Sequence, residues 1–148
     1  MSSNSSRTAV SAELGLGLVG PEQTIVPLMA SLSYSCQDPY AVKIAFHVGT
    51  DEPVEWTLAR DLLAAALHSR EGIGDVQAWP SAASDDVAGI SQKVLNISMT
   101  SPFGHAQFEA SAAAVDSFLA QTYQVVPDGH ESDHMDFDAE LTELLSQA

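Results

Sequence analysis

Apolar residues alternate with polar or small ones over most of the first sixty positions, and this alternation is the strongest constraint on the fold. Between residues 10 and 18 the apolar side chains are Val10, Ala12, Leu14, Leu16 and Leu18. A period of two places successive side chains on opposite faces of a β-strand, so the pattern predicts a strand with one buried face. The glycines of "GLGLVG" then lie inside a strand, whereas a phosphate-binding loop would have to open a helix.

The alternation recurs over residues 26–36, 40–48 and 54–58. The turn sequences "GPEQ", "QDPY" and "TDEP" separate these stretches, and Pro27 indicates an edge position or a bulge. Strands so close in sequence pair most simply as an antiparallel meander.

The period changes near residue 59 to that of a helix. One helical face carries Ala59, Leu62, Leu63, Ala66 and Leu67, and Thr57 is predicted to cap this helix. Strands are predicted near residues 75–80, 89–99 and 103–110, followed by a helix over residues 111–124. A short last helix presents Phe137, Leu141, Leu144 and Leu145 on one face.

This order of elements predicts the α+β class with a mainly antiparallel sheet. The 148 residues suffice for one buried core, so we expect a flexible N-terminal arm over residues 1–7 and a single domain over residues 8–148.

The charge balance limits the partners. Five Lys and Arg oppose twenty Asp and Glu, a formal net charge of −15, and the residues after Val126 include seven acids and no Lys or Arg. Nucleic-acid binding and docking on anionic lipid both depend on basic side chains, so neither is expected. With one cysteine, Cys36, no long apolar run and no secretory signal, we expect a cytoplasmic protein without membrane insertion.

One literal motif raises the question of metal chemistry. "HESDH" matches the zinc-protease pattern, with His130 and His134 as ligands and Glu131 as general base. That chemistry needs a stable helix, yet "PDG" precedes the string and the helical apolar pattern begins only after it. We interpret it as a hydrated connector and expect no metal or other cofactor. Stoichiometric zinc and activity abolished by Glu131→Gln would contradict this.

The remaining chemistry-bearing residues are scattered. His47, His68 and His105 are expected to be structural, because no Ser or Asp stands at a recognisable triad spacing. Arg60 and Asp61 are expected to form a solvated pair or cap at a helix start, and Trp56 and Trp79 to anchor the core or an interface. The sequence predicts no catalytic residue and no enzyme.

Three longer strings carry more information: "DPYAVKIAFHVG" at 38–49, "VEWTLARDLL" at 54–63 and "GIGDVQAWP" at 72–80. Their order and spacing resemble the SsgA-like proteins, a sporulation and cell-division family of actinomycetes, and in particular its septum-positioning branch. The resemblance continues through "SPFGHAQFEA" at 101–110, "SFL" at 117–119 and "FDAEL" at 137–141.

The resemblance implies a non-enzymatic regulator that helps position the septum and bring the tubulin-like division protein FtsZ to it. It also implies a whirly-like fold, with antiparallel sheets packed across one another plus helices, a homotrimer, and FtsZ or other septal and SsgA-like proteins as partners at the division septum. The family supplies no catalytic residues.

An adaptor of this kind needs exposed apolar anchors, because two acidic proteins gain nothing from long-range attraction. The candidate anchors near turns are Tyr40, Trp79 and Phe103. A single-stranded nucleic-acid-binding module, suggested by the whirly likeness alone, and a metal-dependent hydrolase remain alternatives, both disfavoured.

Overall fold

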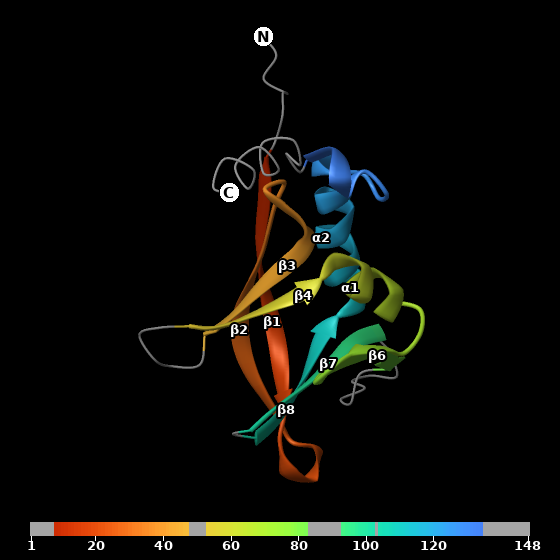
Figure 1. Cartoon of the computed structure of the whole chain (residues 1–148). Helices are drawn as coiled ribbons and strands as arrows, with labels where there is room; N and C mark the ends of the chain where they lie inside the picture. Colours follow the sequence, from red (N-terminus) through yellow and green to blue (C-terminus); the bar gives the residue numbers. More distant parts are fainter. Residues whose placement is uncertain (1–7, 48–52, 83–92, 103, 135–148) are drawn as a thin grey trace, which may run out of the picture.

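The computed structural model describes residues 8–47, 53–82, 93–102 and 104–134, and within them one eight-stranded sheet with two α-helices (Figure 1). The strands are β1 (Ala9–Val19), β2 (Ile25–Ser35), β3 (Asp38–His47), β4 (Val54–Ala59), β5 (Glu71–Ile73), β6 (Val76–Ala82), β7 (Lys93–Ser101) and β8 (Gly104–Ser111). The helices are α1 (Arg60–Ala66) and α2 (Ala112–Val125), with two 3₁₀ helices, η1 (Pro21–Gln23) and η3 (Glu131–His134).

The predicted α+β class is confirmed. All the strand pairs are antiparallel, in the order β4-β3-β2-β1-β8-β7-β6-β5. Gly15 and Gly17 of "GLGLVG" lie inside β1, as the alternation predicts, whereas Gly20 follows the strand. Residues 89–92 of the strand predicted over residues 89–99, and the last predicted helix, lie outside the described residues.

One local prediction is wrong, and one short strand was not predicted. Thr57 lies within β4 and does not cap α1; the N-cap is Ala59, whose side chain makes no capping bond. The short strand β5 was not predicted, because "REGIG" reads as a helix stop and three residues are too few to show an alternation. β5 is held by pairing with β6 rather than by its own sequence pattern.

The sheet is strongly curled, which brings its two halves face to face. Phe46 of β3 and Phe108 of β8 are separated by two intervening strands, so a flat sheet would hold their backbones about 14 Å apart. Their rings instead stack with centroids 4.5 Å apart and an interplanar angle of 21°. The halves β1–β4 and β5–β8 therefore pack across one another, with the core between them.

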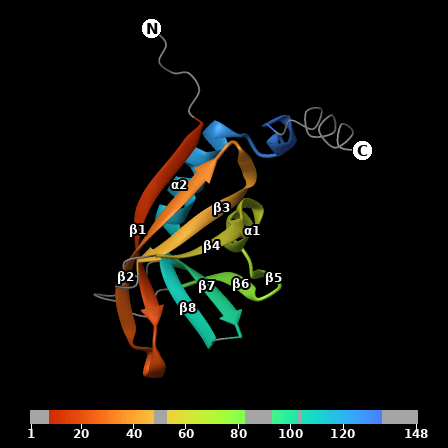
Figure 2. The same cartoon turned by 60° about the vertical axis from the view of Figure 1, so that its left-hand side comes forward.

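Both helices complete this core. α2 contacts β1, β2, β7 and β8, and begins where the Ser111 side chain accepts a hydrogen bond from the Ala114 N–H at 3.1 Å. Its buried face carries Val115, Phe118, Leu119 and Thr122. α1 contacts β3, β4, β5 and β6, so it bridges the two edge strands of the curled sheet (Figures 1 and 2).

The Phe stack yields a stability prediction. Phe108→Ala removes a ring that is 7% exposed and should lower the free energy of unfolding by about 3–4 kcal/mol, measured by urea denaturation. Val54→Ala, at a position 47% exposed, is the control and should cost about 0.5 kcal/mol or less. Equal losses for the two variants would contradict the packed contact between the halves.

Candidate functional site

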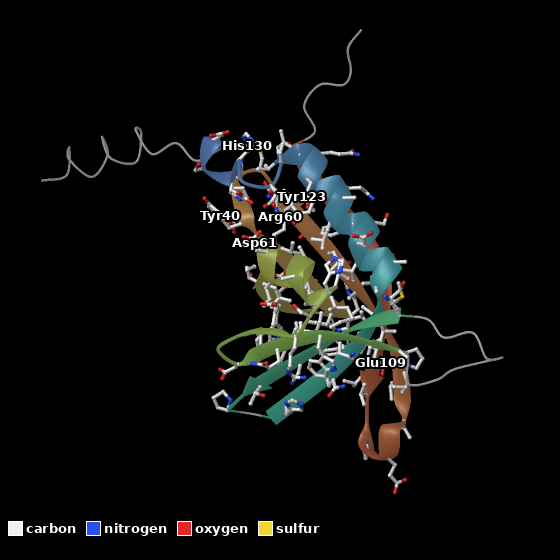
Figure 3. The ribbon with its side chains drawn as sticks, turned by 90° about the vertical axis from the view of Figure 1, so that its right-hand side faces the viewer. Tyr40, Arg60, Asp61, Glu109, Tyr123 and His130 are labelled. Atoms are coloured by element: carbon white, nitrogen blue, oxygen red, sulfur yellow. The ribbon has the colours of Figure 1, made fainter. Side chains whose placement is uncertain are left out.

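The most unusual side chain in the described structure is Arg60, which is 0% exposed at the first residue of α1. The chain passes there directly from β4 into the helix, and Leu62 and Leu63 turn toward the core. Asp61 is exposed. The predicted solvated Arg60–Asp61 pair is therefore wrong for Arg60, which points into the protein (Figure 3).

The Arg60 guanidinium bonds to the end of α2 and to the segment beyond it. Nη1 donates to the Val126 carbonyl at 2.8 Å and to the Thr122 carbonyl at 3.2 Å. Nη2 donates to Glu131 Oε2 at 2.8 Å. Among the described residues Nε has no partner. One buried cation thus joins α1, the C-terminal end of α2 and η3.

Two tyrosine rings flank the same guanidinium. Its central carbon lies 4.3 Å from the ring centroid of Tyr123 and 4.9 Å from that of Tyr34. Such cation–π contacts stabilise a desolvated arginine. The Tyr34 hydroxyl donates to the Pro39 carbonyl at 2.9 Å, and burial raises the pKa of Tyr34 to about 12 although Arg60 opposes the rise. Burial also raises the pKa of Tyr123, so both rings stay neutral at physiological pH.

Glu131 neutralises the buried arginine. Glu131 is 6% exposed. The hydrogen bond from Arg60, aided by backbone N–H donors, lowers the pKa of the Glu131 carboxyl. A buried charge pair contributes little net stability, but loss of one partner leaves the other uncompensated. Glu131 therefore holds η3 against the rest of the protein, and its carboxylate is engaged in the ion pair with Arg60.

Three carboxylates approach one another beside Arg60. Asp61, Asp128 and Glu131 each place an oxygen within 4.8 Å of the others. A cation bound there would compete with the guanidinium for Glu131 and would be repelled by its charge. The donor set suits the arginine better than a metal ion.

The geometry of "HESDH" explains the motif without metal chemistry. A zinc protease needs both histidines on one face of an α-helix and a free glutamate between them. Here η3 is a four-residue 3₁₀ helix, in which positions four apart do not align. Glu131 bonds Arg60, and His130 Nδ1 bonds Asp133 Oδ2 at 2.9 Å. The motif lies in a connector, as interpreted from the sequence, but the prediction of a hydrated segment is wrong for Glu131, which is buried against Arg60.

The histidines of the sheet bond to neighbouring hydroxyls. His47 Nε2 lies 3.1 Å from Ser31 Oγ, and His105 Nδ1 lies 3.0 Å from Thr100 Oγ1. In each case the partner is on the adjacent strand, which is the structural role predicted for them.

The two candidate anchors within the described residues lie in different halves of the sheet. Tyr40 is 46% exposed on β3, where a register shift against β2 turns Pro39 inward and Tyr40 outward. Trp79 is half-buried on β6, in the other half of the sheet, and the Arg70 guanidinium covers its ring at 4.3 Å. Phe103 lies outside the described residues.

Sequence reasoning missed the buried arginine. Two signals could have revealed it: Arg60 stands three residues before Leu63, on the same helical side, and it follows a strand with no turn between. Its partner Glu131 is 71 residues away, a separation that no local pattern predicts.

Fold and site together define an α+β protein with a curled antiparallel sheet, in which the polar clusters described above serve the structure. Among solved structures, that of an SsgA-like sporulation-specific cell division protein from Thermobifida fusca matches with a TM-score of 0.80 and 48% identity, over 94% of this chain and 97% of the other. A second, described as "Mutations in SsgB correlate to longitudinal cell division during sporulation of Streptomyces coelicolor", matches with a TM-score of 0.79 and 46% identity, over 86% and 95% of the two chains.

The sequence comparisons identify the same family as the structural comparisons. The family model "Streptomyces sporulation and cell division protein, SsgA" matches residues 28–131. The sporulation-specific cell division protein SsgB of Thermobifida fusca is 48% identical over 97% of this chain and 99% of its own length, and SsgB of Streptomyces coelicolor 45% identical over 95% and 98%. The chain belongs to the SsgA family. Its role is in cell division, and the family is not a known enzyme family.

No helix in the described part of the chain is long and apolar enough to cross a membrane.

The buried ion pair yields a stability prediction. Glu131→Gln keeps the shape but leaves Arg60 without its counter-charge, so the free energy of unfolding should fall by about 2–3 kcal/mol. Asp133→Asn, at an exposed carboxylate paired with His130, is the matched control and should change it by about 0.5 kcal/mol or less. Urea denaturation at pH 7 measures both. A Glu131→Gln loss no larger than the control's would contradict the stabilising role of the pair.

The same pair predicts a pH dependence. Because the pKa of Glu131 is lowered in the folded state, its carboxylate stabilises the fold fully above the pKa of an unfolded Glu, about 4.3. That stabilisation is lost as the pH falls through the lower, folded pKa. The gap in free energy of unfolding between wild type and Glu131→Gln should stay constant from pH 7 to about 5 and shrink below about 4.3. A difference in free energy of unfolding that persists unchanged to pH 3 would contradict this pH dependence.

Proposed function

We propose that this protein is a sporulation-specific cell-division adaptor that helps position the septum and recruit FtsZ to it through protein–protein contacts. The observation that carries the proposal is the near-full-length match to proteins named SsgB, at 48% identity over 97% of the chain for one of them. Its partners are FtsZ and other septal or SsgA-like proteins, and it acts from the cytoplasm at the division septum as a homotrimer.

The arrangement of polar residues supports an adaptor rather than a catalyst. Glu131 is bonded to Arg60, and His47 and His105 are bonded to hydroxyls of adjacent strands. The exposed Tyr40 ring offers the kind of aromatic anchor that dominates many protein interfaces. Contact through such a ring would persist at moderate salt, because it does not depend on long-range attraction.

The nucleic-acid alternative loses support from the placement of the basic residues. Single-stranded nucleic acids need a basic groove with open stacking rings. Arg60 is buried and neutralised by Glu131, and Arg70 already covers the ring of Trp79. A gel shift at low salt tests this alternative, and clear binding would favour it.

Co-sedimentation with polymerised FtsZ from the same organism tests the proposal. Wild-type protein should be enriched in the pellet, and Tyr40→Ser should reduce that enrichment several-fold because it removes a 46% exposed aromatic side chain. Val54→Ser, at a position 47% exposed on β4, is the matched control and should pellet like wild type.

The co-sedimentation results distinguish the role of Tyr40 from the adaptor function itself. No enrichment of wild type would overturn direct FtsZ recruitment. Enrichment that Tyr40→Ser leaves unchanged would keep the adaptor function and reject Tyr40 as an anchor.

A further inference from the structure

The segment after α2 is attached to the rest of the protein through one buried side chain. We name residues 127–134, which end in η3, the strap. From Pro127 to Asp133 every residue except Glu131 is exposed. The N–H groups of His130 and Asp133 donate to the Pro127 and His130 carbonyls at 3.0 and 3.1 Å, so these two hydrogen bonds lie within the strap. Glu131 is therefore the buried point of attachment of the strap.

The Arg60 guanidinium has four partners outside the strap. Nη1 donates to the Thr122 and Val126 carbonyls at the end of α2. The rings of Tyr34, in β2, and Tyr123, in α2, lie against the guanidinium. These four partners keep the cation in place when the strap leaves. We name Arg60 with the two rings the socket.

One edge of the guanidinium is only half used. Nε and Nη2 share this edge, where their N–H groups lie parallel and match the two oxygens of a carboxylate. Nη2 donates to Glu131 Oε2 at 2.8 Å, whereas Nε is buried and has no partner among the described residues. The Glu131 carboxylate divides its bonds between Arg60 and backbone N–H groups of the strap, at Gly129 and Glu131. A carboxylate that is not tied to the strap is able to bond Nε and Nη2 together, and so to satisfy a buried donor that is costly to leave unpaired.

The charges around the socket favour release of the strap and define the ligand. Asp61, Asp128 and Glu131 each place an oxygen within 4.8 Å of the others, so the closed strap holds two carboxylates against a third. Release removes Asp128 together with Glu131 and leaves Asp61 beside Arg60 (Figure 3). A ligand that suits both remaining charges presents a carboxylate to Arg60 and a basic side chain to Asp61. Because a buried ion pair contributes little net stability, we expect the strap to open at a lower free energy than global unfolding requires.

We propose that the socket binds a carboxylate side-on and that the strap closes it with Glu131. A partner segment that presents a carboxylate beside a basic side chain takes the place of Glu131, with its carboxylate on Nε and Nη2 of Arg60 and its basic group on Asp61. Such a pair carries no net charge, so the charge of −15 on this chain does not repel it at long range. Glu131 acts as a built-in competitor for the socket. The inference stands apart from the proposed function, because no contact with FtsZ enters it.

Acetate tests the socket in the full-length Glu131→Ala variant, which removes the competing carboxylate. At about 100 mM and pH 7, acetate should raise the midpoint of thermal unfolding of this variant by roughly 2–4 °C more than that of wild type, relative to sodium chloride of equal ionic strength. The reason for the rise is that acetate binds the folded socket and not the unfolded chain. Asp133→Ala, which leaves Glu131 in place, is the matched control and should respond like wild type.

Two results of this experiment would count against the socket. Equal responses of folded Glu131→Ala and wild type would reject carboxylate binding. A rise of the same size in sodium phosphate, whose second charge meets Asp61, would reject the assignment to carboxylates.

Amide hydrogen exchange of wild type tests displacement of the strap and requires no variant to fold. A capped peptide whose centre reads Glu-Lys, at about 50 mM, should speed exchange of the His130 and Asp133 amides roughly threefold or more, because binding to the open form raises its population and a released strap is too short to stay folded. The same peptide with Gln-Lys is the control and should leave the rates unchanged. Unchanged rates with the Glu-Lys peptide would overturn displacement by a partner, whatever acetate does, and would leave FtsZ recruitment to be decided by co-sedimentation.

Discussion

The burial of one guanidinium beneath the end of α2 is the interaction on which the arrangement of both helices depends. A helix C-terminus carries partial negative charge and is usually stabilised by a basic side chain in its last turn. α2 has none there, and Arg60 supplies the positive charge from a helix that begins more than sixty residues earlier. Desolvating that charge is costly, and Glu131 with two tyrosine rings offsets the cost.

The position of Arg60 also matters for the closure of the sheet. The sheet curls until Phe46 and Phe108 stack, and α1 bridges its edge strands β4 and β5. Because Arg60 is the first residue of α1, the same side chain that neutralises the end of α2 also fixes where the bridging helix starts. The bridging of the edge strands by α1 and the anchoring of η3 thus share one residue, Arg60.

The local structure could be predicted well from the sequence, whereas the long-range contacts could not. Alternation at residues 10–18 and 26–36 predicted β1 and β2, because half-buried strands must repeat with a period of two. The burial of Arg60 was not predicted, because its partners Thr122, Val126 and Glu131 are distant in sequence and only the fold brings them together. Tyr40 shares the parity of the buried residues of β3, and only the register shift against β2 exposes it.

The turn end of the β1–β2 hairpin and the segment that leaves α2 lie at opposite ends of the protein (Figure 3). Asp128, Glu131 and Asp133 begin the acidic stretch at one end, while the other end is nearly uncharged. Electrostatic repulsion in physiological salt decays over about 8 Å. The acidic stretch therefore repels other anionic molecules mainly at its own end of the protein. The two ends of the molecule therefore differ in charge, one acidic and the other nearly uncharged.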